Sequence, residues 1–304
     1  MPGTLYPYPA GFQFIIWTHR GNEVCFFGGR PFARFFFSPG FQFQQGFETV
    51  LSDISLDFCS RAKPRIDKGL QKRVDQGKMA DPERLSVLSR ISLAGDLTPA
   101  RECDFVIESV LEQIEVKTKV FAQLDDLARS DCILATNTTS LPISEIAAAT
   151  RRSEKVVQMH FFNPPAIMKQ VEIMPGAKTA PETLKAAEEM AKLLGKDPVV
   201  CKNEAVAGIV SRVPGQLLNE ATWLAATGVA DPADIDKAMK PGANHPMGPF
   251  ELLDLIGVDV HRAKMQTLAG PLNDPRYNHP PLIDKMIEES RLGKKVGKGF
   301  YNYE

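Results

Sequence analysis

The spacing of hydrophobic residues first defines a region in which short apolar runs alternate with amphipathic stretches. The predicted strands are residues 48–53, 104–108, 132–137, 156–161, 169–174 and 198–201, and the predicted helices are 55–78, 114–128, 143–150 and 181–195. Strands that alternate with helices predict an α/β fold with a doubly wound, mostly parallel, Rossmann-like sheet covered on both faces. Pro64 lies within the first predicted helix and predicts a kink or a later helix start.

After Lys202 the apolar residues follow only the helical period. The expected helices cover residues 206–224, 249–269 and 281–291. We therefore expect an α/β domain over 48–204, followed by a smaller all-helical domain over 205–304.

Residues 1–47 follow neither pattern. They hold eleven of the 18 phenylalanines, seven glycines and five prolines, and they contain no lysine and no aspartate. We find no helical or alternating period in them. The pattern therefore predicts an atypical segment that replaces the first strand of the sheet.

Composition and charge exclude several classes of protein. The 304 residues carry a net charge of -1, which gives no indication of a nucleic-acid partner. No apolar run has the length of about 18 residues that a membrane span needs. The five cysteines are scattered and form no C-x-x-C pair, and the histidines lack metal-ligand spacing, so we expect no disulfide framework, no metal and a cytoplasmic protein. Helix 55–78 has an excess of basic residues, which indicates a solvated face more often than a phosphate site.

Asp53 is the first candidate for chemistry, because it ends a predicted strand in the first half of the sheet. A carboxylate there accepts both ribose hydroxyls of an adenosine and repels a 2′-phosphate, which favours NAD over NADP. The alternatives are a helix N-cap and a solvated turn. The cofactor interpretation also requires a glycine loop about 20 residues upstream. Residues 28–35 contain no G-x-G-x-x-G, and their proline and phenylalanines hinder close approach of a pyrophosphate.

His160 and Glu172 form the most informative pair. If strands 156–161 and 169–174 fold back about Ala166, residues whose numbers sum to 332 face each other. His160 and Glu172 would then lie on one face, about 5 Å apart at Cβ. A carboxylate beside an imidazole fixes its tautomer and favours its charged form, as a general base near neutral pH requires. The alternative is a lone, partly buried histidine near a turn.

The segment Thr136-Asn-Thr-Thr-Ser140 follows a predicted strand. Doubly wound sheets bind ligands at the carboxyl ends of their strands, so these small polar residues are candidates for ligand contact. An N-cap for the helix that follows is equally consistent with the pattern.

From Gly46 to Tyr303 the chain resembles the short-chain L-3-hydroxyacyl-CoA dehydrogenases, and in particular the bacterial 3-hydroxybutyryl-CoA type. The matching segments, in order, are Gly46-Phe-Glu-Thr-Val-Leu-Ser-Asp53, Phe105-Val-Ile-Glu108, Thr136-Asn-Thr-Thr-Ser140, Met159-His-Phe-Phe-Asn-Pro164, Val171-Glu172, His245-Pro-Met-Gly-Pro249 and Arg291-Leu-Gly-Lys-Lys-Val-Gly-Lys-Gly-Phe-Tyr301. The His-Phe-Phe-Asn-Pro run and the lysine-rich C-terminal segment are the most specific of them.

The resemblance implies an NAD-dependent oxidation of an L-3-hydroxyacyl-CoA in fatty acid metabolism, such as β-oxidation. His160 would take the hydroxyl proton while C3 passes a hydride to the nicotinamide, and Glu172 would orient His160. The implied substrate contacts are Thr139, Asn163 and Ser211, and the implied cofactor contacts are Asp53, Glu112, Lys117, Thr139, Asn163 and Lys295. Many members carry an asparagine at the position of Ser211. The family also implies an acyl-CoA substrate and a homodimer formed by the C-terminal helical domain.

The resemblance stops upstream of Gly46, where family members open with a strand and a glycine loop. The abrupt change in composition suggests the hypothesis of a reading-frame error or an unrelated start before that point. The alternative for the chain as written is a non-catalytic acyl-CoA-binding dimer without a competent NAD site. A two-domain dehydrogenase of a small hydroxy acid is a third interpretation, which the pairing of His160 with Glu172 disfavours.

Overall fold

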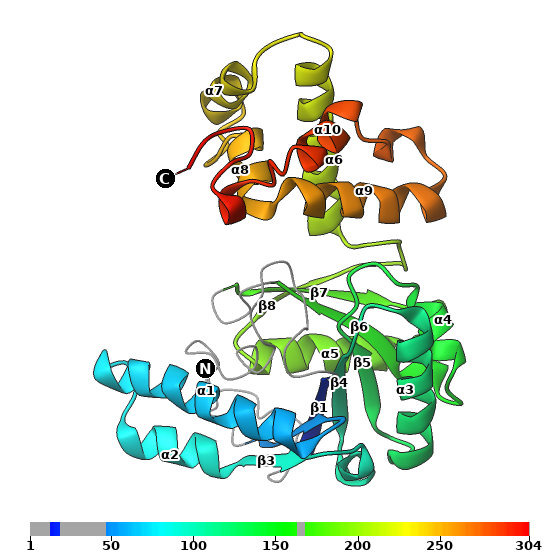
Figure 1. Cartoon of the computed structure of the whole chain (residues 1–304). Coiled ribbons are helices and arrows are strands. Elements are labelled where there is room, and N and C mark those ends of the chain that lie inside the picture. Colours follow the sequence, from blue (N-terminus) through cyan, green and yellow to red (C-terminus); the bar gives the residue numbers. More distant parts are fainter. Residues whose placement is uncertain (1–12, 19–46, 163–167, 304) are drawn as a thin grey trace, which may run out of the picture. The chain divides into compact units, whose positions relative to one another are not determined.

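The computed structural model describes residues 13–18, 47–162 and 168–303 (Figure 1). The chain divides into two compact units, Met1–Ala205 and Val206–Glu304. This division lies one residue beyond the boundary that the sequence predicts.

The first unit is built on an eight-stranded sheet with the order β3-β2-β1-β4-β5-β6-β7-β8. The strands are β1 (Gln13–Thr18), β2 (Glu48–Asp53), β3 (Ile91–Ala94), β4 (Phe105–Ser109), β5 (Ile133–Thr136), β6 (Val156–Phe161), β7 (Gln170–Pro175) and β8 (Asp197–Val200). All neighbouring strands are parallel except β6 and β7. The predicted fold class, a mostly parallel Rossmann-like sheet, is confirmed.

Strand β1 corrects the prediction that no strand precedes residue 48. Gln13–Thr18 pairs in parallel with β2 on one side and β4 on the other. Its sequence, Gln-Phe-Ile-Ile-Trp-Thr, is rich in β-branched and aromatic residues, which favour strands. Phe-Ile-Ile-Trp within it is one continuous apolar run, a pattern that is typical of strands in parallel sheets and shows no alternation. The sequence pattern also missed β3.

Helices cover both faces of the sheet. They are α1 (Leu56–Asp75), α2 (Asp81–Ser89), α3 (Ile114–Leu127), α4 (Ile143–Ala148) and α5 (Pro181–Leu193). In β4, Phe105 and Ile107 pack into a core with residues of α1 and α5, whereas Val106 packs into a second core with α3 and α4. Side chains that alternate between two cores are the physical basis of the doubly wound fold. Helix α1 begins at Leu56 and contains Pro64, so the expected later start is wrong.

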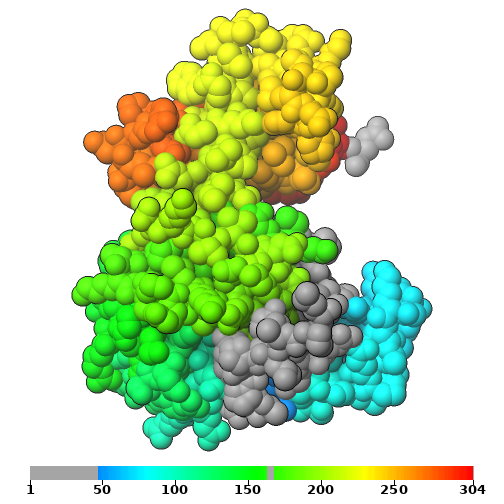
Figure 2. All heavy atoms as spheres, turned by 180° about the vertical axis from the view of Figure 1, so that it is seen from behind, coloured from blue at the N-terminus to red at the C-terminus, as the bar shows by residue number. Residues whose placement is uncertain are grey.

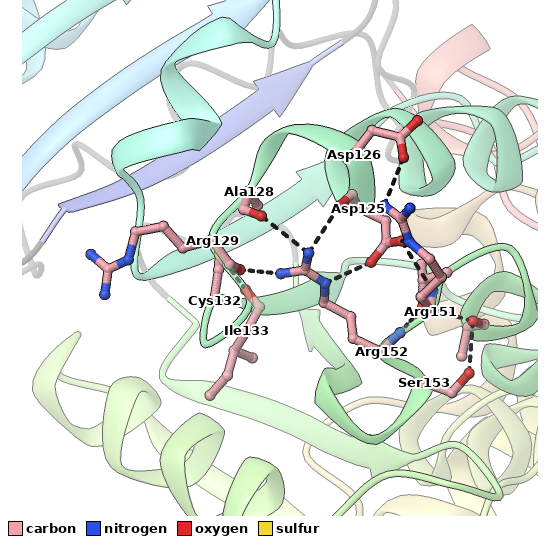
Figure 3. A network of polar contacts seen from close by, with 11 residues as sticks. Asp125, Asp126, Ala128, Arg129, Cys132, Ile133, Arg151, Arg152 and Ser153 are labelled. Carbon is pink, nitrogen blue, oxygen red and sulfur yellow. Dashed lines mark hydrogen bonds and ion pairs between the residues drawn. The ribbon is translucent and has the colours of Figure 1, made fainter.

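A network of buried polar contacts joins the end of α3 to the segment that leads into β6 (Figure 3). The guanidinium of Arg152 donates to Asp125 Oδ1 at 2.6 Å and to the carbonyl oxygens of Asp125 and Ala128 at 2.8 and 3.1 Å. Burial opposes the charged form of Asp125, but hydrogen bonds from Arg151 and Arg152 hold the pKa of its carboxyl below the usual range. Arg152 thus satisfies carbonyls that a helix end leaves unpaired.

The second unit is helical, with α6 (Ile209–Ala226), α7 (Pro232–Gly242), α8 (Pro249–Ile256), α9 (Val258–Leu272) and α10 (Pro281–Glu288). Its yellow to red segments, distant in sequence, pack into one body (Figure 2). The single helix predicted over 249–269 is two helices. Gly257, with φ of 111°, separates them because most other residues avoid that conformation. Among the described residues, no helix is both long and apolar enough to cross a membrane.

Buried Asp254 organises the lysine-rich C-terminal segment. Its carboxylate accepts hydrogen bonds from the backbone N–H groups of Phe300 and Tyr301, each at 2.9 Å, and from the Tyr303 hydroxyl at 2.9 Å. A Cβ atom at Gly299 would lie 2.0 Å from Asp254 Oδ1. This close approach explains why a glycine stands at that position.

Candidate active site

Polar residues gather at one edge of the sheet in the first unit. Strands β2, β4, β5 and β6 run in the same direction, so their carboxyl ends meet at one edge. The residues at or near these ends are Asp53, Glu108, Thr136 and His160, and all four are buried. Ligands of doubly wound sheets bind at this edge, so the polar residues there form the candidate active site.

His160 and Glu172 occupy directly opposed positions on the antiparallel strands β6 and β7, as the sequence predicts. The imidazole Nδ1 lies 3.5 Å from Glu172 Oε2. The side chain of His160 is 5% exposed and that of Glu172 is fully buried. This geometry rules out the alternative of a lone histidine near a turn.

The alternation of side chains along β6 explains the orientation of His160. Met159 and Phe161 point into the core that contains α1 and α5. His160 lies between them in sequence and therefore faces the opposite side of the sheet, toward α3 and α4. The ring of Phe162 packs against the imidazole, with ring centroids 4.7 Å apart.

Thr139 approaches the other nitrogen of the same imidazole. Its Oγ1 lies 3.4 Å from His160 Nε2. The imidazole therefore has a carboxylate near one nitrogen and a hydroxyl near the other. The segment of Thr139 does not supply the N-cap of α4, because that position is Pro142, which makes no side-chain capping bond.

Glu112 and Lys117 also lie beside this turn. Glu112 Oε1 accepts hydrogen bonds from the Thr139 and Ser140 backbone N–H groups at 2.7 and 3.0 Å. Lys117 Nζ lies 3.6 Å from Glu112 Oε2, and its side chain is fully buried.

Glu108 is the residue of this region that the sequence interpretation missed as a functional candidate. Both of its carboxylate oxygens accept from Lys117 Nζ, at 2.8 and 3.1 Å, and Oε2 also accepts from the Thr136 hydroxyl at 2.7 Å. The signal in the sequence was a charged residue at the end of an otherwise apolar strand. Such a residue requires a buried partner.

Asp53 ends β2 and is 1% exposed, so it is not a solvated turn residue. Its Oδ1 accepts from the backbone N–H of Ile54 at 2.7 Å. The N-cap of α1 is Ser55, whose side chain accepts from the Asp57 backbone N–H. Both alternatives for Asp53 are therefore wrong, and its position is the one that a ribose-binding carboxylate occupies in dinucleotide-binding folds.

Three further predicted site residues are not part of the described first unit. Asn163 is outside the described residues. Ser211 is buried near the start of α6 and Lys295 pairs with Asp259 at 2.5 Å, and both belong to the second unit. The described part of the chain contains no group of His, Cys, Asp and Glu side chains that could hold a metal ion.

Comparisons with known proteins identify the family of the chain. The family model of the 3-hydroxyacyl-CoA dehydrogenase NAD-binding domain matches residues 40–205, and that of the C-terminal domain matches residues 209–303. The chain belongs to the 3-hydroxyacyl-CoA dehydrogenase family, and it is an NAD-dependent enzyme of that family.

Individual relatives match most of the chain. A probable 3-hydroxybutyryl-CoA dehydrogenase of Deinococcus radiodurans is 41% identical over 261 residues, which cover 86% of this chain and 93% of the relative. A 3-hydroxybutyryl-CoA dehydrogenase of Clostridioides difficile is 42% identical over 238 residues, or 78% of this chain and 84% of the relative. The crystal structure of (S)-3-hydroxybutyryl-CoA dehydrogenase from Ralstonia eutropha has a TM-score of 0.82 at 31% identity and covers 95% of this chain and 99% of its own.

Proposed function

We propose that this enzyme oxidises L-3-hydroxybutyryl-CoA to the 3-oxoacyl-CoA, with His160 as the general base. The observation that carries the proposal is the imidazole of His160, which lies 3.5 Å from the Glu172 carboxylate at the ligand-binding edge of the sheet. The relatives named as 3-hydroxybutyryl-CoA dehydrogenases support this choice of substrate.

The roles of the residues follow from the two sides of the imidazole. Nε2 faces the hydroxyl of Thr139, so it is the nitrogen that takes the proton of the substrate 3-hydroxyl group. Nδ1 faces Glu172, which fixes the tautomer and stabilises the imidazolium formed after proton transfer. Thr139, Asn163 and Ser211 would contact the substrate.

The residues at the edge of the sheet fit part of an NAD molecule. Asp53 is a buried carboxylate at the end of β2, where the ribose of the adenosine would be held. The further proposed contacts of the cofactor are Glu112, Lys117, Thr139, Asn163 and Lys295. Bound NAD supplies the acceptor of the hydride that leaves C3.

Replacement of His160 by Gln tests the proposal. We expect kcat for 3-hydroxybutyryl-CoA to fall by about 10²–10⁴-fold because the proton acceptor is lost, with little change in the Kd of NAD. The matched control is His245→Gln, in the second unit, which should keep the parent rate. Undiminished turnover by the His160 variant would remove this residue from the mechanism.

A second candidate function is a non-catalytic acyl-CoA-binding dimer. The observation in its favour is that residues 1–47 contain no Gly-x-Gly-x-x-Gly, and the NAD-binding family model begins its match only at residue 40. Calorimetric titration of the purified chain with NAD and with acyl-CoA separates the two functions. Binding of acyl-CoA without binding of NAD favours the second candidate.

We also propose boundaries for the domains of the chain. Residues 1–47 would be an atypical segment that comes from a reading-frame error or an unrelated start, and its residues Gln13–Thr18 supply strand β1. Residues 48–204 would form the rest of the NAD-binding domain and 205–304 the helical domain. Translation of the gene in the two other frames tests this hypothesis. If neither frame contains a Gly-x-Gly-x-x-Gly sequence upstream of Gly46, the hypothesis of a frame error fails.

We further propose a homodimer through the helical domain. Ile209, Val213 and Trp223 share one face of α6 and are 49%, 64% and 37% exposed. An exposed apolar face of this kind is typical of a protein interface. Sedimentation of Val213→Glu should show weaker association than the parent chain.

The four described cysteines are free, which suits a cytoplasmic enzyme.

A further inference from the structure

Lys117 is a fully buried cation that lies between two carboxylates. Its Nζ donates to Glu108 at 2.8 and 3.1 Å and lies 3.6 Å from Glu112 Oε2. Glu108 is also fully buried, whereas the side chain of Glu112 is 38% exposed. One ammonium group therefore compensates a buried carboxylate and attracts a second, more exposed one.

Glu112 in turn fixes the turn that carries Thr139. Its Oε1 accepts from the Thr138 hydroxyl at 2.6 Å and from the backbone N–H groups of Thr139 and Ser140 at 2.7 and 3.0 Å. The Thr138 hydroxyl also accepts from the Leu141 backbone N–H at 3.0 Å. Three donors that converge on one carboxylate oxygen leave the turn little freedom, because hydrogen bonds to charged acceptors are strong.

The position of Glu112 depends on the lysine. The ammonium of Lys117 attracts the Glu112 carboxylate across 3.6 Å, and replacement of the lysine removes this attraction. Glu108 is buried within the sheet edge, so the partly exposed Glu112 is the one free to turn toward solvent. The Thr138–Ser140 turn would then lose its common acceptor.

We propose that Lys117 is a positioning residue for the oxidation: it holds Glu112, which holds the Thr138–Ser140 turn and thereby sets the Thr139 hydroxyl against His160. The imidazole is then held between Thr139 on Nε2 and Glu172 on Nδ1. The expected effect of Lys117 on the rate rests on the proposed function of His160 as the general base. The restraint that Lys117 and Glu112 place on the turn does not depend on that function.

The test uses the full chain with the double substitution Glu108→Gln and Lys117→Met, which removes both buried charges together. The single substitution Lys117→Met would leave a buried carboxylate without its cation and could unfold the chain. The control is Asp125→Asn with Arg152→Met, which removes a buried ion pair near the C-terminal end of α3 (Figure 3), whereas Lys117 lies near the N-terminal end of that helix. A third variant, Glu112→Ala, removes the acceptor itself.

Hydrogen exchange at the backbone amides of Thr139 and Ser140 is the first measurement. We expect exchange about tenfold faster in the double variant, and at least as fast in Glu112→Ala, because a hydrogen bond to a charged acceptor is lost. The control pair should leave these two amides as protected as in the parent. Unchanged protection in the double variant, or an equal change in the control, would overturn the proposal.

The second measurement is the division of the kinetic effect between kcat and KM. We expect kcat to fall about tenfold in the double variant with KM for 3-hydroxybutyryl-CoA within about threefold, because neither Glu108 nor Lys117 is a proposed substrate contact. The control pair should keep both constants. A fall in kcat equal to that of the control would show a purely structural role.

The exchange data decide the proposal even in a chain that does not turn over substrate. A changed exchange rate together with full activity of His160→Gln would refute the role of His160 and leave the restraint on the turn intact.

Discussion

Two buried histidines, one in each unit, differ in the groups that surround them. His160 is 4% exposed and faces a carboxylate and a hydroxyl. His261, on α9, is 1% exposed, and its Nε2 has no hydrogen-bond partner among the described residues. Burial, together with electrostatic interaction with Lys264 and His279, lowers the pKa of His261 to about 3.

The comparison teaches that burial does not identify a catalytic histidine. His261 lies on α9 between Val258 and Met265, which belong to two apolar clusters, so it is a neutral part of the core over the physiological pH range. His160 has an anionic partner that allows the imidazole to accept a proton during the reaction. The same side chain thus serves packing in one unit and chemistry in the other.

Glu172→Gln should bring the surroundings of His160 closer to those of His261, and it carries the largest expected effect. The amide keeps the shape of the side chain but removes the charge that stabilises the imidazolium. We expect kcat to fall by about 10²-fold, equivalent to about 2.7 kcal/mol of barrier. Steady-state kinetics measure this, with the exposed Glu182→Gln as a control. A loss of less than threefold would mean that the carboxylate does not assist proton transfer.

The claim that His261 is a buried, neutral histidine is tested by the pH dependence of the free energy of unfolding. The pKa of His261 is lower in the folded chain than the value of about 6.5 in the unfolded chain. Its contribution to stability is therefore fully present above pH 6.5 and is lost as the pH falls toward 3. Between pH 6.5 and 5 we expect the free energy of unfolding to decrease by about 2 kcal/mol from this group.

Urea unfolding of the parent chain and of His261→Phe at both pH values isolates that contribution. The variant should lose less stability on acidification than the parent, because the other titrating groups are common to both chains. An equal loss in the two chains would show that His261 is not a buried neutral histidine.

Both histidines are visible in the sequence, but only one could be assigned from it. The pairing of β6 with β7 was predictable because a turn between adjacent antiparallel strands fixes which residues face each other, and this placed Glu172 opposite His160. His261 had no such partner nearby in sequence. Its surroundings depend on how α9 packs within the second unit, which the helical period alone does not specify.

Other errors of the sequence interpretation also arise where contacts between elements decide the structure. Strand β1 was missed because a central strand lacks the alternation of a half-exposed one, and the break at Gly257 was missed because the apolar period continues across it. Glu108 was overlooked because its partner, Lys117, lies on the next helix. Local patterns identify elements well, whereas contacts between elements require the fold.

Thr139 sharpens the comparison with the smallest expected effect, because it contacts the imidazole only through a hydroxyl at 3.4 Å from Nε2. Thr139→Ser keeps that hydroxyl and should leave kcat within about threefold of the parent. Thr139→Val keeps the shape but removes the hydrogen-bonding group, and we expect a loss of about tenfold, the equivalent of one hydrogen bond. The difference between the two variants isolates the hydroxyl from the methyl group. Equal rates for Ser and Val would leave Glu172 as the partner that distinguishes His160 from His261.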